Sequence, residues 1–268
     1  KAKINDRLSN QFSVYRTKVD FQDNYNKSGN GFGQAWTMGM KTIGVSDQLT
    51  YTTEKQTITG GVDWYRDEIT KYHNDPFYNA STEQVPDGIH INNTAFYLQD
   101  KIALTNQWNI TPGVRVDHHS TFGTHTSPSL SVGFKQSENT NYYVNYKTFF
   151  VAPNLYQLFG SDAYFGHVGN KNLKPQEGNT IEFGINHNFG DNLTGTFNVY
   201  HTHAKNILYA DPSDNYHYVN GGKSSLNGFT INLDKKFSSH WAAGIGYSYL
   251  HVPAKEGQNI NFNCSLPE

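Results

Sequence analysis

The chain of 268 residues has no apolar run near the roughly 18 residues that a membrane-spanning helix needs, which excludes a helical membrane protein. It has one cysteine, Cys264, so neither a disulfide framework nor a cysteine-based zinc cluster can form within these residues. Neither sign of charge is in large excess, since 21 Lys and Arg face 23 Asp and Glu, and this argues against nucleic-acid binding. Intrinsic disorder does not fit, because 15% of the residues are aromatic.

The mean hydropathy is -0.68, which on its face suggests a soluble protein. A transmembrane β-barrel also gives a low average, because polar lumenal residues alternate with apolar lipid-facing ones along each strand. The chain starts at Lys1 without an initiator methionine or a signal peptide, and we interpret it as a mature or trimmed piece.

Apolar and polar residues alternate with a period of two along most of the chain. The clearest example runs from Trp108 to Val116, with Ile110 and Val114 in phase and Asn109 and Arg115 out of phase. The pattern predicts an all-β protein with about eleven strands of the length that a tilted strand needs to cross a bilayer. We place these strands near residues 4–17, 36–51, 55–69, 92–105, 107–119, 126–136, 140–149, 178–189, 192–204, 225–237 and 240–251.

The expected connections alternate between short turns and long loops, which is typical of outer-membrane barrels. Short turns are predicted at 52–54, 106, 136–139, 190–192 and 238–239, and long loops at 18–35, 70–91, 119–126, 150–177 and 205–224. An odd number of strands cannot close antiparallel with one another, so the pattern indicates part of a larger barrel.

Two short boxes make the sequence distinctive. The first is Phe149-Phe150-Val151-Ala152-Pro153, and the second is Asn170-Lys171-Asn172-Leu173-Lys174-Pro175. They resemble the Phe-Arg-Ala-Pro and Asn-Pro-Asn-Leu-(Lys/Arg)-Pro-Glu boxes of TonB-dependent outer-membrane receptors. Val151 replaces the Arg, Lys171 replaces the first Pro, and Gln176 displaces the Glu by one position. Further similarity covers residues 50–252.

This resemblance implies a transmembrane, antiparallel, up-and-down barrel of roughly 22 strands. Residues 1–268 would then belong to its barrel domain, with the plug domain and the C-terminal strands outside this chain. The family is bacterial, resides in the outer membrane and performs no covalent chemistry. The implied function is import of a scarce metal chelate, a ferric siderophore or haem, with energy from TonB. The implied partners are the TonB complex acting through the plug, lipopolysaccharide and other outer-membrane lipid, and the chelate; no intrinsic cofactor and no nucleic acid are expected.

Aromatic and histidine side chains gather in the two longest predicted loops. Rings with polar tips suit a planar or aryl-bearing chelate. We therefore predict ligand contacts from Tyr156, Phe159, Tyr164, Phe165, His167, Tyr209, Tyr216 and His217, with Tyr218 beside them. Tyrosines near strand ends, such as Tyr200 and Tyr247, are instead assigned to the aromatic girdle at the membrane interface.

His167 is also a candidate axial ligand for haem iron, because haem receptors that resemble this family place a histidine between the two boxes. The alternative is an ordinary solvated loop histidine. Cys264 is expected in an outer loop, where a disulfide partner would come from the remainder of the barrel.

An acidic and histidine-rich stretch offers an enzymatic alternative. Asp117, His118, His119 and His125 could form a metal site or the dyad of an outer-membrane hydrolase. We favour an ion pair between Asp117 and Arg115, two residues apart on the inward phase of one strand. A passive pore and a cobalamin receptor of the same family remain as further alternatives.

Overall fold

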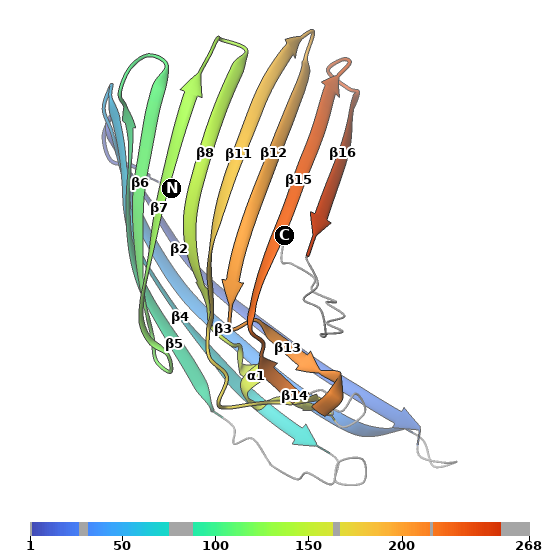
Figure 1. Ribbon diagram of the computed structural model, residues 1–268. Coiled ribbons are helices and arrows are strands. Elements are labelled where there is room, and N and C mark those ends of the chain that lie inside the picture. Colours follow the sequence, from blue (N-terminus) through green and yellow to red (C-terminus); the bar gives the residue numbers. More distant parts are fainter. Residues whose placement is uncertain (1, 27–31, 75–87, 163–166, 215–216, 253–268) are drawn as a thin grey trace.

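The computed structural model describes residues 2–26, 32–74, 88–162, 167–214 and 217–252. Most of them form one 12-stranded antiparallel sheet whose order follows the chain, with the long loops between β8 and β11 and between β12 and β15 left outside it. Figure 1 shows this sheet curling into an open trough. Its strands are β1 (Ala2–Lys3), β2 (Leu8–Asn26), β3 (Phe32–Thr52), β4 (Gln56–Asn74), β5 (His90–Ala103), β6 (Trp108–His119), β7 (Gly123–Lys135), β8 (Thr140–Val151), β11 (Gln176–Gly190), β12 (Leu193–Lys205), β15 (Lys223–Lys236) and β16 (Ala242–His251).

The eleven predicted strands are confirmed, and the two-residue β1 was not predicted. The largest errors are in length, because β2, β3 and β4 have 19, 21 and 19 residues and extend far into the segments assigned to loops 18–35 and 70–91. In these extensions the outer face becomes charged, while apolar residues such as Val19, Met38 and Ile69 lie on the inner face. The apolar phase therefore shifts by one residue along each strand, which interrupts the alternation that identifies a strand, although the hydrogen-bonded ladder continues.

The sheet has an apolar outer face, as the alternation predicts. One row across six paired strands is apolar throughout, with Val132, Val144, Phe183, Val199, Phe229 and Tyr249 side by side in register. Large side chains of this face are exposed, among them Phe96 at 62% and Val114 at 41%. Trp108, whose burial would have contradicted a lipid-facing surface, is 45% exposed.

The inner face carries polar residues and tyrosines. Tyr143 and Tyr200 lie across the sheet from Gly184 and Gly228. A Cβ added at either glycine would collide with the tyrosine ring, so each ring lies over the bare backbone of its neighbour. The assignment of Tyr200 to an outer girdle is thus wrong, because its neighbour Val199 occupies the outer face. Tyr247 does lie on the outer face and is 60% exposed.

Connections of different length lie at the two ends of the trough. At one end, β11 and β12 are joined through Asp191 and Asn192, both with positive φ, as in the tight hairpin turns that match strand twist. At the other end the predicted long loop 119–126 is wrong, because only residues 120–122 separate β6 from β7. His125 and its neighbours in that polar run continue the ladder with β6.

The two remaining long loops have structure of their own that was not predicted. The first contains α1 (Leu155–Phe159), β9 (Ser161–Asp162) and β10 (His167–Val168). The second contains β13 (Leu208–Asp211), η1 (Pro212–Asp214) and β14 (His217–Asn220). In Figure 1 these elements gather at one end of the trough. Among the described residues, no helix is long and apolar enough to cross a membrane.

Candidate functional site

The first box leads into α1, which folds onto the inner face of the sheet. The helix begins with a capping box: the Gln157 amide donates to Asn154 Oδ1 at 2.8 Å, and the Asn154 amide donates to Gln157 Oε1 at 3.0 Å. Pro153, which ends the box, is fully buried. The box therefore turns the chain away from the sheet and starts the helix over the end of the trough.

A small apolar core holds α1 in this position. Leu155 is 2% exposed and packs with Met38, Ile69 and Ile91, which come from β3, β4 and β5. Tyr156 and Phe159 pack against the same cluster and are partly buried. These two predicted ligand contacts therefore contribute to anchoring the helix, while part of each side chain stays accessible.

A second, four-stranded sheet joins the two long loops. Its order is β13-β14-β10-β9, with Val168 of β10 paired in parallel with His217 of β14. Tyr209 pairs with Val219 in the β13–β14 hairpin. The structure thus brings His167, Tyr209 and His217, predicted from separate loops, into one small sheet; we call it the loop sheet.

Asparagine side chains fasten the loop sheet to the second box. Asn220 accepts from the Lys174 amide at 2.7 Å and donates to the Lys174 carbonyl at 2.8 Å. Asn170 donates to the Tyr218 carbonyl at 2.9 Å, and Asn206 donates to the Pro175 carbonyl at 3.2 Å. The second box is therefore a connector between the loops. Sequence reasoning named the box but missed this role, for which its asparagines were the available signal.

Two titratable groups of the loop sheet have shifted pKa values. The Ser213 hydroxyl and amide donate to Asp211 Oδ1 at 2.7 and 2.9 Å, and they hold the pKa of Asp211 below its usual value. Burial raises the pKa of Tyr218 above its usual value. The Tyr218 ring meets Tyr156 edge-on at 6.1 Å, which joins the loop sheet to α1.

The predicted ligand contacts fall into three groups. Tyr156, Phe159, Tyr209 and His217 lie on α1 and the loop sheet, and His217 Nδ1 is 3.2 Å from Asp214 Oδ2. His167 is placed by its backbone, which pairs with Asp162. Tyr164, Phe165 and Tyr216 lie outside the described residues, as does Cys264.

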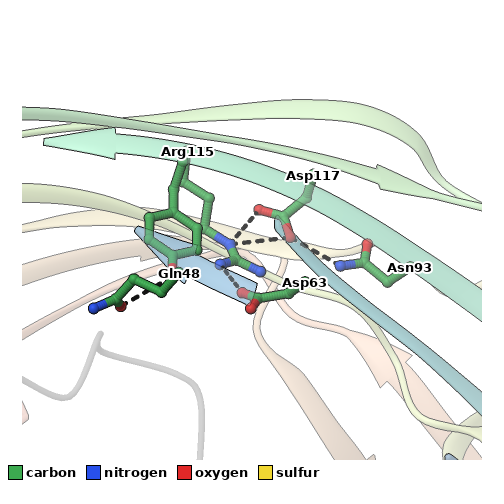
Figure 2. A network of polar contacts seen from close by, with 6 residues as sticks. Gln48, Asp63, Asn93, Arg115 and Asp117 are labelled. Carbon is green, nitrogen blue, oxygen red and sulfur yellow. Dashed lines mark hydrogen bonds and ion pairs between the residues drawn. The ribbon is translucent and has the colours of Figure 1, made fainter. Parts of the chain in front are cut away.

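Farther along the inner face, Arg115 organises a network that spans β4, β5 and β6 (Figure 2). Its Nη1 is 2.6 Å from Asp63 Oδ2, and its Nε is 3.0 Å from Asp117 Oδ2. Asn93 donates to the other oxygen of Asp117 at 2.9 Å. The predicted pairing of Arg115 with Asp117 is confirmed, and both oxygens of this nearly buried carboxylate are occupied.

Two of the three histidines near Asp117, His119 and His125, share its inner face, with His125 directly across the ladder from it. His118 and His119 are neighbours on a strand and project to opposite faces, and His118 Nδ1 lies 3.0 Å from Thr124 Oγ1. His119 is 1% exposed beside Phe122, with ring centroids 4.9 Å apart. Within the described parts of the chain, no three His, Cys, Asp or Glu side chains converge as a metal site.

A cleft of about 560 Å³ lies where β7 and β8 separate near the loop end. Their pairing stops at Ser129, and Phe150 of the first box fills part of the opening by stacking on His125 at 3.8 Å. Glu177 lies 3.4 Å from His125 Nδ1 and 2.8 Å from Lys205 Nζ. This charged cluster was not predicted, because its members come from three distant stretches of the sequence.

Together these features define one wall of a large antiparallel barrel, with a polar inner face and an end covered by an ordered loop sheet. The chain belongs to the family described as "TonB dependent receptor-like, beta-barrel", whose model matches residues 2–264. The barrel expected from the sequence is thereby confirmed, and this chain forms part of a larger one.

Among curated proteins, the chain is 27% identical over 179 residues to a probable TonB-dependent siderophore receptor, PiuA of Acinetobacter baumannii, covering 60% of this chain and 24% of that one. It is 25% identical over 264 residues to the vitamin B12 transporter BtuB of Photobacterium profundum, covering 94% and 39%. The chain thus spans less than half the length of these relatives, which are named as a receptor and a transporter rather than enzymes.

Among solved structures, the fold is similar to that of a mutant of the ferric enterobactin receptor of Pseudomonas aeruginosa in complex with enterobactin. The TM-score is 0.69 at 18% identity, covering 91% of this chain and 41% of the receptor. At this identity the likeness concerns the fold.

Proposed function

We propose that this chain is part of an outer-membrane receptor that binds a scarce metal chelate and imports it with energy passed through TonB. The observation that carries the proposal is the joining of both long loops into one sheet over the inner face of a wall from this family. Such a cover holds aromatic and histidine side chains at the end where the long loops lie, which faces outward in outer-membrane barrels. The TonB complex would act through a plug domain outside this chain.

The apolar outer face supports placement in the outer membrane. Its unbroken apolar row would be costly in water and is suited to lipid tails. The inner face carries the charges of Arg115, Asp63 and Asp117, which lipid would penalise. Lipopolysaccharide and other outer-membrane lipids are therefore the surroundings that we assign to the outer face.

Within this function, a ferric siderophore or haem is the proposed cargo. The siderophore-receptor relative supports the first. The second rests on His167, whose backbone lies in the loop sheet next to the strand of His217. A neutral imidazole there could supply an axial bond to haem iron. Cobalamin is the competing cargo, because a vitamin B12 transporter matches 94% of the chain.

Growth of a strain that lacks the receptor gene tests these cargoes. On iron-limited medium we expect the intact gene to restore growth on one iron source, either haem or a ferric siderophore. Rescue on haem that is lost in His167→Ala would assign haem as the cargo and His167 as its ligand, and rescue on a ferric siderophore but not on haem would assign a siderophore. Indifference to every iron source, with rescue of cobalamin-dependent growth, would overturn the iron proposal.

A further inference from the structure

On the outer face of β2, β3 and β4, charged residues directly follow the apolar surface. Val14, Val45 and Trp64 form a row across the three strands. Two residues farther toward the long-loop end, Arg16 and Arg66 flank Ile43 in the same register. Apart from Asp47, which lies between Phe12 and Val62 one row earlier, the outer face of these strands therefore changes from apolar to charged side chains between two successive rows.

The next rows add more positive charge. Lys18 and Lys41 pair with each other in register, with Glu68 beside them. Beyond a bulge, Asp20 and Lys71 flank Gly39, and their side chains cover the position where a Gly39 side chain would stand. We call the cations of these rows the basic band: Arg16, Lys18, Lys41, Arg66 and Lys71.

The basic band has more cations than its own carboxylates balance. Asp20 lies 3.1 Å from Lys18 and 3.5 Å from Lys71, and Glu68 lies 3.3 Å from Lys41 and 3.4 Å from Arg66. Five cations against two carboxylates leave an excess of three positive charges. Within the described residues, Arg16 makes no ion pair.

The basic band is exposed to the surroundings of the outer face and is confined to β2, β3 and β4. The side chains of Lys18 and Lys71 are 55% and 51% exposed. On the next strand the same rows carry the uncharged Asn92 and the histidine His90. Because the charges stand on the outer face, they point away from the cargo path along the inner face.

We propose that the basic band binds the phosphate groups of a glycolipid in the outer leaflet, lipopolysaccharide in particular. This inference rests on the proposed placement in the outer membrane. Continuity with the lipid-facing surface favours a lipid headgroup, since tails beside Val14 and Phe12 bring their phosphates to the height of Arg16 and Lys18. Guanidinium and ammonium groups around a shared anion then supply charge-assisted hydrogen bonds.

The test uses the complete receptor purified from outer membranes. The variant Arg16→Gln/Lys18→Gln/Lys71→Gln removes three cations from the band. The control Lys55→Gln/Lys101→Gln/Lys135→Gln removes three lysines from the short-turn end. Native mass spectrometry would measure the lipopolysaccharide that each purified receptor retains. A second assay would measure binding of each receptor to vesicles that contain lipid A with or without its phosphates.

We expect the band variant to lose at least about tenfold in lipid A binding, with the control unchanged. Removal of the lipid phosphates should abolish the difference, and inorganic phosphate alone should not bind measurably. Equal glycolipid retention by the two variants, or unchanged binding of the unmodified receptor to lipid A after its phosphates are removed, would overturn the proposal. Cargo-dependent growth is measured on the same strains as a test of the transport function alone, because the band variant leaves the inner face intact. Failure of the lipid-binding proposal can therefore be distinguished from failure of the proposed transport function.

Discussion

Arg115 and Asp63 form an ion pair across an intervening strand, with Nη1 and Oδ2 2.6 Å apart. Arg115 is on β6 and Asp63 on β4, while β5 passes between them with only Ala95 and Tyr97 at this level of the inner face. Ala95 is fully buried beneath the pair, and Arg115 lies 5.8 Å from the centre of the Tyr97 ring. The pair therefore couples strands that have no backbone hydrogen bonds to each other.

Replacement of Arg115 by Met should destabilise the receptor by about 1–2 kcal/mol. The loss leaves Asp117, whose side chain is 12% exposed, without its cation, and partial exposure of Arg115 limits the effect. Thermal unfolding in detergent, followed by the gel shift of the folded barrel, measures it. Arg7→Met, which removes an exposed arginine outside both the network and the basic band, is the matched control; equal effects of the two variants would contradict a structural role for the network.

Leu155→Ala should open a cavity beneath α1. The side chain is 2% exposed against Met38, Ile69 and Ile91, and truncation of such a residue costs about 2–4 kcal/mol. Since the helix is fixed locally, we expect faster hydrogen exchange in residues 154–160 with the sheet unchanged. Leu104→Ala, at a site 60% exposed in a short turn, should leave exchange unaltered. Unchanged protection in Leu155→Ala would show that the apolar cluster does not hold the helix.

Asn220→Ala should release the loop sheet from the second box. It removes both hydrogen bonds to the Lys174 backbone and the one to the Asn206 carbonyl at 3.0 Å, for a cost of about 1–3 kcal/mol. Exchange at Lys174 and along residues 217–220 should rise together, because the two loops are one unit.

Asn232→Ala is the control for this variant, since Asn232 makes one side-chain hydrogen bond, to Thr196 on the next strand. If only one of the two loops gains exchange in Asn220→Ala, they are not coupled through this asparagine.

The elements that could be read from the sequence are those in which one face meets lipid and the other does not. The stretch from Trp108 to Val116 is an example, because its alternation records both environments. Where β2–β4 continue past Arg16, Ile43 and Arg66, apolar residues such as Met38 and Ile69 move to the inner face, so the alternation changes phase. His125 was assigned to a loop for another reason, because the residues around it are polar on both faces of the strand.

The candidate site was less predictable because its contacts join distant segments. Tyr156 and Phe159 could be chosen as loop aromatics, yet nothing local indicates that Ile69 and Ile91 would bury one side of the helix. Pairing of β10 with β14 depends on single strands of two and four residues, too short for a recognisable period. By contrast, the spacing of Arg115 and Asp117 on one strand face was enough to predict their ion pair.

Arginine at position 144 should destabilise the membrane-inserted barrel by about 2–4 kcal/mol, while arginine at position 145 should be tolerated within about 1 kcal/mol. Val144 is 42% exposed in the apolar row of the outer face, where a charge would face hydrocarbon. Asn145 follows it on the inner face, paired with Glu182, which offers a carboxylate to the new cation. Urea unfolding of Val144→Arg and Asn145→Arg in lipid vesicles measures both. Equal stability of the two variants would mean that the outer face does not contact lipid. If Asn145→Arg were the more destabilised variant, the face that we call inner would face lipid, and there would be no basis for placing the cargo path along Arg115.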